Sequence, residues 1–101
     1  MLGNGVTVQG NCTPGAIVLQ IKTTSGLSNL QVSGTGFESG KPAVGAVMVD
    51  DALATALSAA NLVQFDVIAR DKTVGGFARV DALLEYGVPS CTFAGMITPS
   101  S

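Results

Sequence analysis

The sequence contains no histidine and no tryptophan, and few of its residues are charged. Lys, Arg, Asp and Glu make up 12% of the 101 residues, about half of the roughly 25% that is usual in soluble domains. Without histidine, a zinc site built from Cys and His is excluded, and so is a nucleophile activated by an imidazole base. The net charge is −2 and the five cations are dispersed, so the chain also lacks the basic surface that nucleic-acid binding needs.

Long apolar runs are absent as well. A transmembrane helix needs about 18 consecutive apolar residues. Each apolar stretch of this chain is shorter, because it is interrupted by Gly, Thr, Ser or Asp. Residues 1–4 form neither the basic region nor the apolar region of a signal peptide, so we expect an intracellular chain. A bridge between the two cysteines, Cys12 and Cys91, would tie the two ends of the chain together. Because thiols stay reduced inside cells, we expect free thiols rather than this disulfide.

The hydrophobic content, 47%, excludes a disordered chain and supplies a core for a single domain over residues 1–101. The pattern predicts a mainly β fold, a small β-sandwich or barrel-like domain with one short helix. Loops are expected at 34–36 and 39–42, and residues 81–86 fit either a strand or a helical turn. The expected strands cover residues 6–8, 16–21, 27–32, 44–49, 63–70, 77–81 and 91–97.

The clearest strand lies at 63–70, where apolar and polar residues alternate. Val63, Phe65, Val67 and Ala69 would share one face, which predicts that this face is buried. Asp71-Lys72 and Gly75-Gly76 then indicate a hairpin connection to the next strand.

The helix is predicted over about 51–62. Asp50 is a suitable N-cap, because its carboxylate can accept hydrogen bonds from the first-turn amides. Leu53, Leu57 and Ala60 then fall on one apolar stripe. We interpret Asp50 and Asp51 as a cap and first turn rather than as a catalytic carboxylate pair.

Residues 34–42 resemble a phosphate-binding loop only superficially. The motif needs a glycine where Thr35 stands, and it needs a hydroxyl residue where Pro42 follows Lys41. We therefore expect a turn here. The sequence predicts no catalytic, cofactor-binding or metal-binding residues.

The charges are concentrated in the middle of the chain. Lys22 is the one charge in residues 1–37, residues 86–101 have none, and the other eleven lie from Glu38 to Glu85. A small domain with uncharged ends lacks the mixed charged surface that keeps monomers apart in solution. Interfaces of permanent oligomers are poor in charge. The pattern therefore predicts a building block of a larger assembly, with its termini as contact arms.

Three segments, in this order, resemble the small head-decoration (cement) proteins of tailed phages of the lambda type. They are residues 42–49 (PAVGAVMV) followed by Asp51, residues 76–84 (GFARVDALL) and residues 92–97 (TFAGMI). The family is mostly β, and its trimers sit on the capsid surface and clamp neighbouring coat subunits. The resemblance implies the same role here. Residues 1–21 differ, because the family's arm is polar and rich in Pro and Ser, whereas these residues predict two strands.

The sequence thus predicts a structural virion protein, assembled in the host cytoplasm, that forms a homotrimer and binds the major capsid protein. We expect no enzymatic activity, cofactor, small-molecule substrate, nucleic acid or membrane partner. Other classes stay open: another virion component such as a tail or fibre-attachment subunit, an exported adhesin or pilin-like domain with Cys12 bridged to Cys91, or a small enzyme. The residues expected in contacts or in the trimer core, unless they fill the monomer core, are Leu2, Val6, Val8, Phe93, Met96 and Ile97.

Overall fold

The computed structural model describes residues 2–42, 45–87 and 90–100, and in these ranges the chain forms strands and turns without a helix. The expected mainly β fold is confirmed. The strands in this part of the chain are β1 (Leu2–Gly3), β2 (Val6–Thr13), β3 (Ala16–Thr23), β4 (Leu30–Glu38), β5 (Val49–Ala52), β6 (Ala54–Ala59), β7 (Leu62–Asp71), β8 (Phe77–Gly87) and β9 (Ser90–Ser100).

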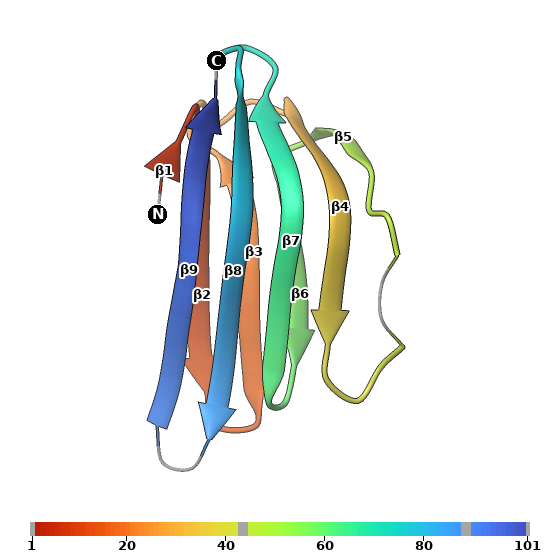
Figure 1. Cartoon of the computed structure of the whole chain (residues 1–101), viewed down its shortest axis with the longest axis vertical. Coiled ribbons are helices and arrows are strands. Elements are labelled where there is room, and N and C mark those ends of the chain that lie inside the picture. Colours follow the sequence, from red (N-terminus) through yellow and green to blue (C-terminus); the bar gives the residue numbers. More distant parts are fainter. Residues whose placement is uncertain (1, 43–44, 88–89, 101) are drawn as a thin grey trace.

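The strands form two antiparallel sheets that lie one over the other (Figure 1). The four-stranded sheet has the order β1-β2-β3-β6, and the five-stranded sheet has the order β5-β4-β7-β8-β9. In Figure 1 the five-stranded sheet lies in front, with β9 at its left edge and β2 behind it. The chain changes sheet between β3 and β4, between β5 and β6, and between β6 and β7.

The core lies between the two sheets and is formed by every second side chain along the strands. Val63, Phe65, Val67 and Ala69 of β7 are buried, which confirms the face predicted from the sequence. Side chains of successive residues in a strand point to opposite faces, so one face of each sheet is apolar and the other faces solvent. The remaining buried apolar residues are Val6, Val8, Ile17, Leu19, Ile21, Leu30, Val32, Leu57, Ala78, Val80, Ala82 and Leu84.

The first hairpin is built on a two-residue turn. Gly3 pairs with Val6, and between them Asn4 and Gly5 have φ values of 49° and 80°. Positive φ at both turn positions is the geometry that an Asn-Gly pair favours, because it matches the twist of the strands. The Asn4 side chain also donates a 2.7 Å hydrogen bond to the carbonyl of Phe77, which ties this hairpin to the start of β8.

The helix predicted over 51–62 is wrong. This segment forms the end of β5, a bend at Leu53 and then β6, which pairs with β3 and completes the four-stranded sheet. Of the expected apolar stripe only Leu57 is buried, while Leu53 is 54% exposed. Alanine is a good helix former, but intrinsic propensity is small compared with tertiary interactions, and pairing with the open edge of β3 outweighs it.

The loop expected at 34–36 is also wrong, because β4 runs through it. These glycines are needed for close packing. A Cβ on Gly36 would lie 2.9 Å from Cδ1 of Leu57 in the opposite sheet, and one on Gly34 would collide with the Asp66 carbonyl of β7. Glycine therefore lets the backbone continue as a strand where any side chain would clash.

The strand expected over 44–49 is wrong in its extent. Residue 44 lies outside the described residues, residues 45–48 are not in a strand, and β5 begins only at Val49. β5 is short because its register against β4 shifts between Leu30 and Val32, and Asp51 has a φ of 56°. The expected loop at 39–42 and the hairpin after Asp71 are confirmed, and residues 81–86 belong to β8.

Candidate functional site

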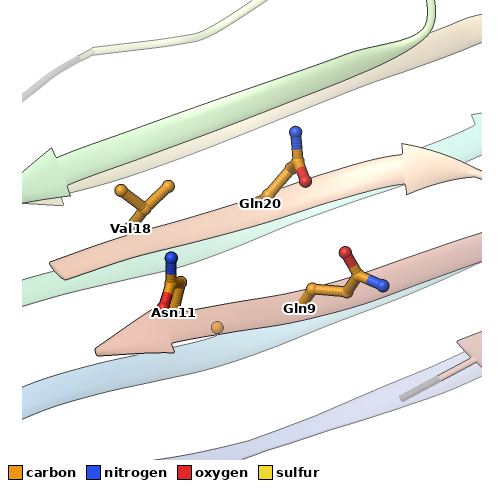
Figure 2. Close-up of a pocket in the computed structure, with 5 residues that line it drawn as sticks. Gln9, Asn11, Val18 and Gln20 are labelled. Atoms are coloured by element: carbon orange, nitrogen blue, oxygen red, sulfur yellow. The ribbon is translucent and has the colours of Figure 1, made fainter. Parts of the chain in front are cut away.

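The outer face of the four-stranded sheet carries a depression of about 530 Å³ between β2 and β3. Gln9 and Asn11 of β2 and Val18 and Gln20 of β3 line it, and Figure 2 shows these side chains rising from the same face of the two strands. Gln9 lies opposite Gln20, and Asn11 lies opposite Val18. We call these four residues the amide face.

The amide face offers hydrogen bonds without charge. Each amide both donates and accepts, so the surface suits a polar, uncharged partner such as another backbone or a hydroxyl-rich group. The neighbouring strand β6 adds Ala56 opposite Gln20 and Ser58 opposite Val18. Lys22, two residues beyond Gln20 along β3, is the charge nearest to this face on the strand.

The outer face of the five-stranded sheet is different, because it combines apolar and charged side chains. A depression of about 220 Å³ lies beside Met48, Ile68 and Phe77, which are 69%, 49% and 45% exposed. The Arg70 guanidinium lies 5.4 Å from the centre of the Phe77 ring, and its Nε donates a 2.7 Å hydrogen bond to Gln31.

A charged cluster lies next to this depression. Arg79 contacts Asp66 at 3.2 Å and Asp81 at 3.3 Å. All three side chains are about half exposed, so solvent screens these ion pairs and they add little to stability. Their effect is to make this part of the sheet a solvated surface rather than an apolar one.

The β6 edge of the four-stranded sheet is closed by side chains from the end of β4 and from the loop that follows it. The Ser58 N–H donates to the Glu38 carboxylate at 2.8 Å, and the Lys41 ammonium donates to the Ser58 carbonyl at 3.1 Å. Glu38 and Lys41 also form an ion pair of 3.5 Å. Both backbone groups of Ser58 that point away from β3 are therefore occupied, and another strand cannot pair there without displacing these side chains.

The β5 edge of the five-stranded sheet is also charged. The Lys72 ammonium lies 2.6 Å from both the Asp50 and the Asp51 carboxylates. The hydrogen bond from Lys72 holds the pKa of Asp50 below its ordinary value, and the contacts with both carboxylates raise the pKa of Lys72. Asp50 therefore forms an ion pair with Lys72 and does not cap a helix.

On the opposite side of the molecule, β9 lies over β2 and the two strands are uncharged. Cys12 of β2 and Cys91 of β9 are joined by a disulfide, with their Cα atoms 6.5 Å apart. The sequence favoured free thiols, and the structure differs because the two strands face each other in opposite sheets at the distance that a disulfide spans. We call β2 and β9 together the uncharged side.

The residues expected at contacts have different positions. Val6 and Val8 point into the core and are buried, and Ile97 packs against that core. Phe93 and Met96 of β9 are 42% and 59% exposed. Leu2 belongs to β1, but its side chain lies outside the described residues. Of the six, Phe93 and Met96 are thus the described side chains that a partner could reach most readily.

The sequence marks Asp71 as the start of a hairpin connection but does not predict that its side chain is fully buried at the end of β7. One carboxylate oxygen accepts hydrogen bonds from the Thr73 N–H at 2.9 Å and from the Thr73 hydroxyl at 2.6 Å. Burial raises the pKa of Asp71, but the hydrogen bonds to its carboxylate, those from Thr73 first, outweigh burial and leave the pKa below its usual value. An Asp two residues before a Thr in a turn is the sequence signal for a carboxylate that accepts hydrogen bonds from the turn.

Within the described ranges, no three or more Cys, Asp or Glu residues are placed to hold a metal ion. That part of the chain also has no helix long and apolar enough to cross a membrane. Comparison of the chain with protein-family models, curated proteins and solved structures finds no match.

Proposed function

We propose that this protein is a structural building block that works by binding, and that it decorates and stabilises a phage head by bridging coat-protein subunits. The observation that carries the proposal is the separation of charge on the sandwich. The amide face and the uncharged side carry hydroxyls, amides and aliphatic groups, while ion pairs occupy the opposite edges and the other sheet face. Uncharged surface of this extent is typical of surfaces that become covered.

The mechanism follows from mass action. A protein that binds the assembled shell better than the free coat subunits shifts the equilibrium toward the shell. Several weak contacts on one oligomer then combine through their effective concentration. The amide face fits this role because it can pair with backbone groups of a coat protein without the desolvation cost of a buried charge.

The disulfide favours a second candidate, an exported adhesin or pilin-like domain. Disulfides persist in secreted proteins and on the surfaces of cells and virions, and they are rare in the cytosol. β-Sandwiches are also common among cell-surface domains that share no sequence similarity. A decoration protein that forms the Cys12–Cys91 bridge after release of the particle remains compatible with the same observation.

Co-purification with virus particles tests the main proposal. The chain, expressed in a culture that is producing phage, is followed through density-gradient purification of the particles. A constant copy ratio to the coat protein supports decoration, and complete loss of the chain from the particle band rejects it. If the chain instead stays with the washed cell surface, the exported candidate is favoured.

An amide-face variant makes this experiment specific. Gln9→Lys combined with Gln20→Lys places two ammonium groups on the amide face. We expect this variant to lose particle binding. The matched control, Ser33→Lys combined with Gln64→Lys, adds the same charge to the outer face of the other sheet and should keep binding.

A further inference from the structure

The two sheets differ in how their edges are protected. An exposed edge strand offers a row of unpaired backbone groups, and proteins usually protect it with charge, with short length or with covering side chains. The β6 edge is covered by Glu38 and Lys41, and the β5 edge is four residues long with Asp50 and Asp51 on it. β1 has two residues and covers the start of β2.

β9 has neither charge nor short length, and Pro99 near its end is the edge-protecting residue that it does carry. It is eleven residues long, it forms the edge of the five-stranded sheet, and it carries no charge (Figure 1). Its outward residues include Ala94 and Met96, both exposed. Pro99, which cannot donate a backbone hydrogen bond, stands near the end of the strand.

We propose that β9 pairs antiparallel with β9 of a second copy of this chain, so that the two five-stranded sheets become one continuous sheet. The inference rests on the proposed function, because it names the contact through which the building block self-associates. It replaces the trimer that the family resemblance implies with a two-fold dimer.

The absence of charge on β9 makes a second copy of this chain a suitable partner for its edge. Two identical strands meet in antiparallel fashion around a two-fold axis, the commonest symmetry of soluble oligomers. Such a pair is disfavoured when like charges face each other. β9 contains no charged residue, so no alignment of two β9 strands creates a repulsive pair. The disulfide from Cys91 to β2 fixes the strand before pairing, which lowers the entropy that association costs.

The register of the proposed pair is fixed if the two β9 strands overlap along their full length. The midpoint of Ser90–Ser100 is Gly95. Around a two-fold axis at this residue, position 94 of each copy lies opposite position 96 of the other. Both positions are on the outer face of the sheet, since Ala94 pairs with the outward Leu83 and Met96 pairs with the outward Asp81.

Charge substitution at these two positions tests the pairing. Ala94→Lys combined with Met96→Lys places ammonium groups opposite each other twice, and we expect the dimer dissociation constant to rise about tenfold. Ala94→Lys combined with Met96→Glu places opposite charges together and should restore dimerisation to about the original level. The control, Ser33→Lys combined with Thr35→Lys, puts the same charges on interior strand β4 and should change nothing.

The readout is sedimentation equilibrium from micromolar to millimolar concentration, with circular dichroism to show that each variant is folded. Hydrogen exchange adds a second measurement, because β9 backbone amides should gain protection as the dimer forms. A wild-type chain that stays monomeric, a trimer, or a dimer that the double lysine variant leaves intact would each overturn the pairing. Particle binding is measured separately, so the pairing can fail while the decoration role stands, and the reverse.

Discussion

The ring of Phe93 in β9 lies directly over Gly10 in β2, so closely that a Cβ on Gly10 would come within 2.8 Å of the ring. Gly10 is not among the residues with positive φ, so packing and not backbone conformation requires a glycine there. This contact and the nearby Cys12–Cys91 bridge hold the edge strand of one sheet onto the other. The inward faces of β2 and β9 are therefore packed against each other, although Phe93 remains partly exposed.

Gly10→Ala should destabilise the protein. The added methyl group displaces the Phe93 ring, and overpacking of this kind costs about 1–3 kcal/mol of the free energy of unfolding. Urea denaturation followed by circular dichroism measures the change. Gly87→Ala is the control, because nothing lies within 4 Å of a Cβ at that position. If Phe93→Ala is introduced first, Gly10→Ala should cost much less, and an equal cost in both backgrounds would contradict the packing explanation.

The alternation of apolar and polar residues predicted most of the strands, because the apolar positions in them are the ones that the fold buries. Val63 to Ala69 is an example, with every second side chain buried in the core. The sequence failed at residues 51–62, where the spacing of Leu53, Leu57 and Ala60 fits a helix and only pairing with β3 decides for a strand. It failed again at Gly34 and Gly36, where glycine marks close approach of Asp66 and Leu57 from distant segments rather than a loop.

Loss of the disulfide should lower stability more than any single contact does. Cys12 and Cys91 are 79 residues apart, and closing a loop of that length removes enough entropy from the unfolded chain to contribute about 4 kcal/mol. Cys12→Ser combined with Cys91→Ser should shift the urea midpoint downward accordingly. A reducing agent should cause the same shift in the wild-type chain and none in the variant. Detection of two free thiols in the denatured, unreduced protein would show that the bridge does not form.

Asp71 should make stability depend on pH in the acid range. Its folded-state pKa is lowered, so its contribution is complete above the unfolded value of about 3.9 and is lost as pH falls through the folded value. Asp71→Asn should cost about 2 kcal/mol at neutral pH and almost nothing in strong acid. Denaturation at a series of pH values measures this difference. Asp66→Asn, at a half-exposed site, is the control, and a penalty for Asp71→Asn that stays constant with pH would contradict the assignment.

The candidate surfaces were only partly visible in the sequence. Eleven of the twelve charges lie at residues 38–85, and the fold brings the uncharged segments near the two ends of the chain together as β2 and β9. The amide face could not be recognised, because Gln9 and Gln20 become neighbours only through the register of β2 and β3. Burial of Val6 and Val8 likewise depends on which face of β2 meets the other sheet.

Removing the Glu38 carboxylate should leave the β6 edge open to pairing with another strand, in addition to the β9 edge. Glu38→Ala leaves the outward N–H of Ser58 without its carboxylate partner, and we expect a loss of about 1 kcal/mol together with new self-association at high concentration. Glu38→Gln keeps an oxygen that can accept this hydrogen bond and should stay close to the wild type in both respects. Light scattering and urea denaturation measure the two effects. Self-association that rises equally in both variants would show that the charge of Glu38, and not its bond to Ser58, protects this edge.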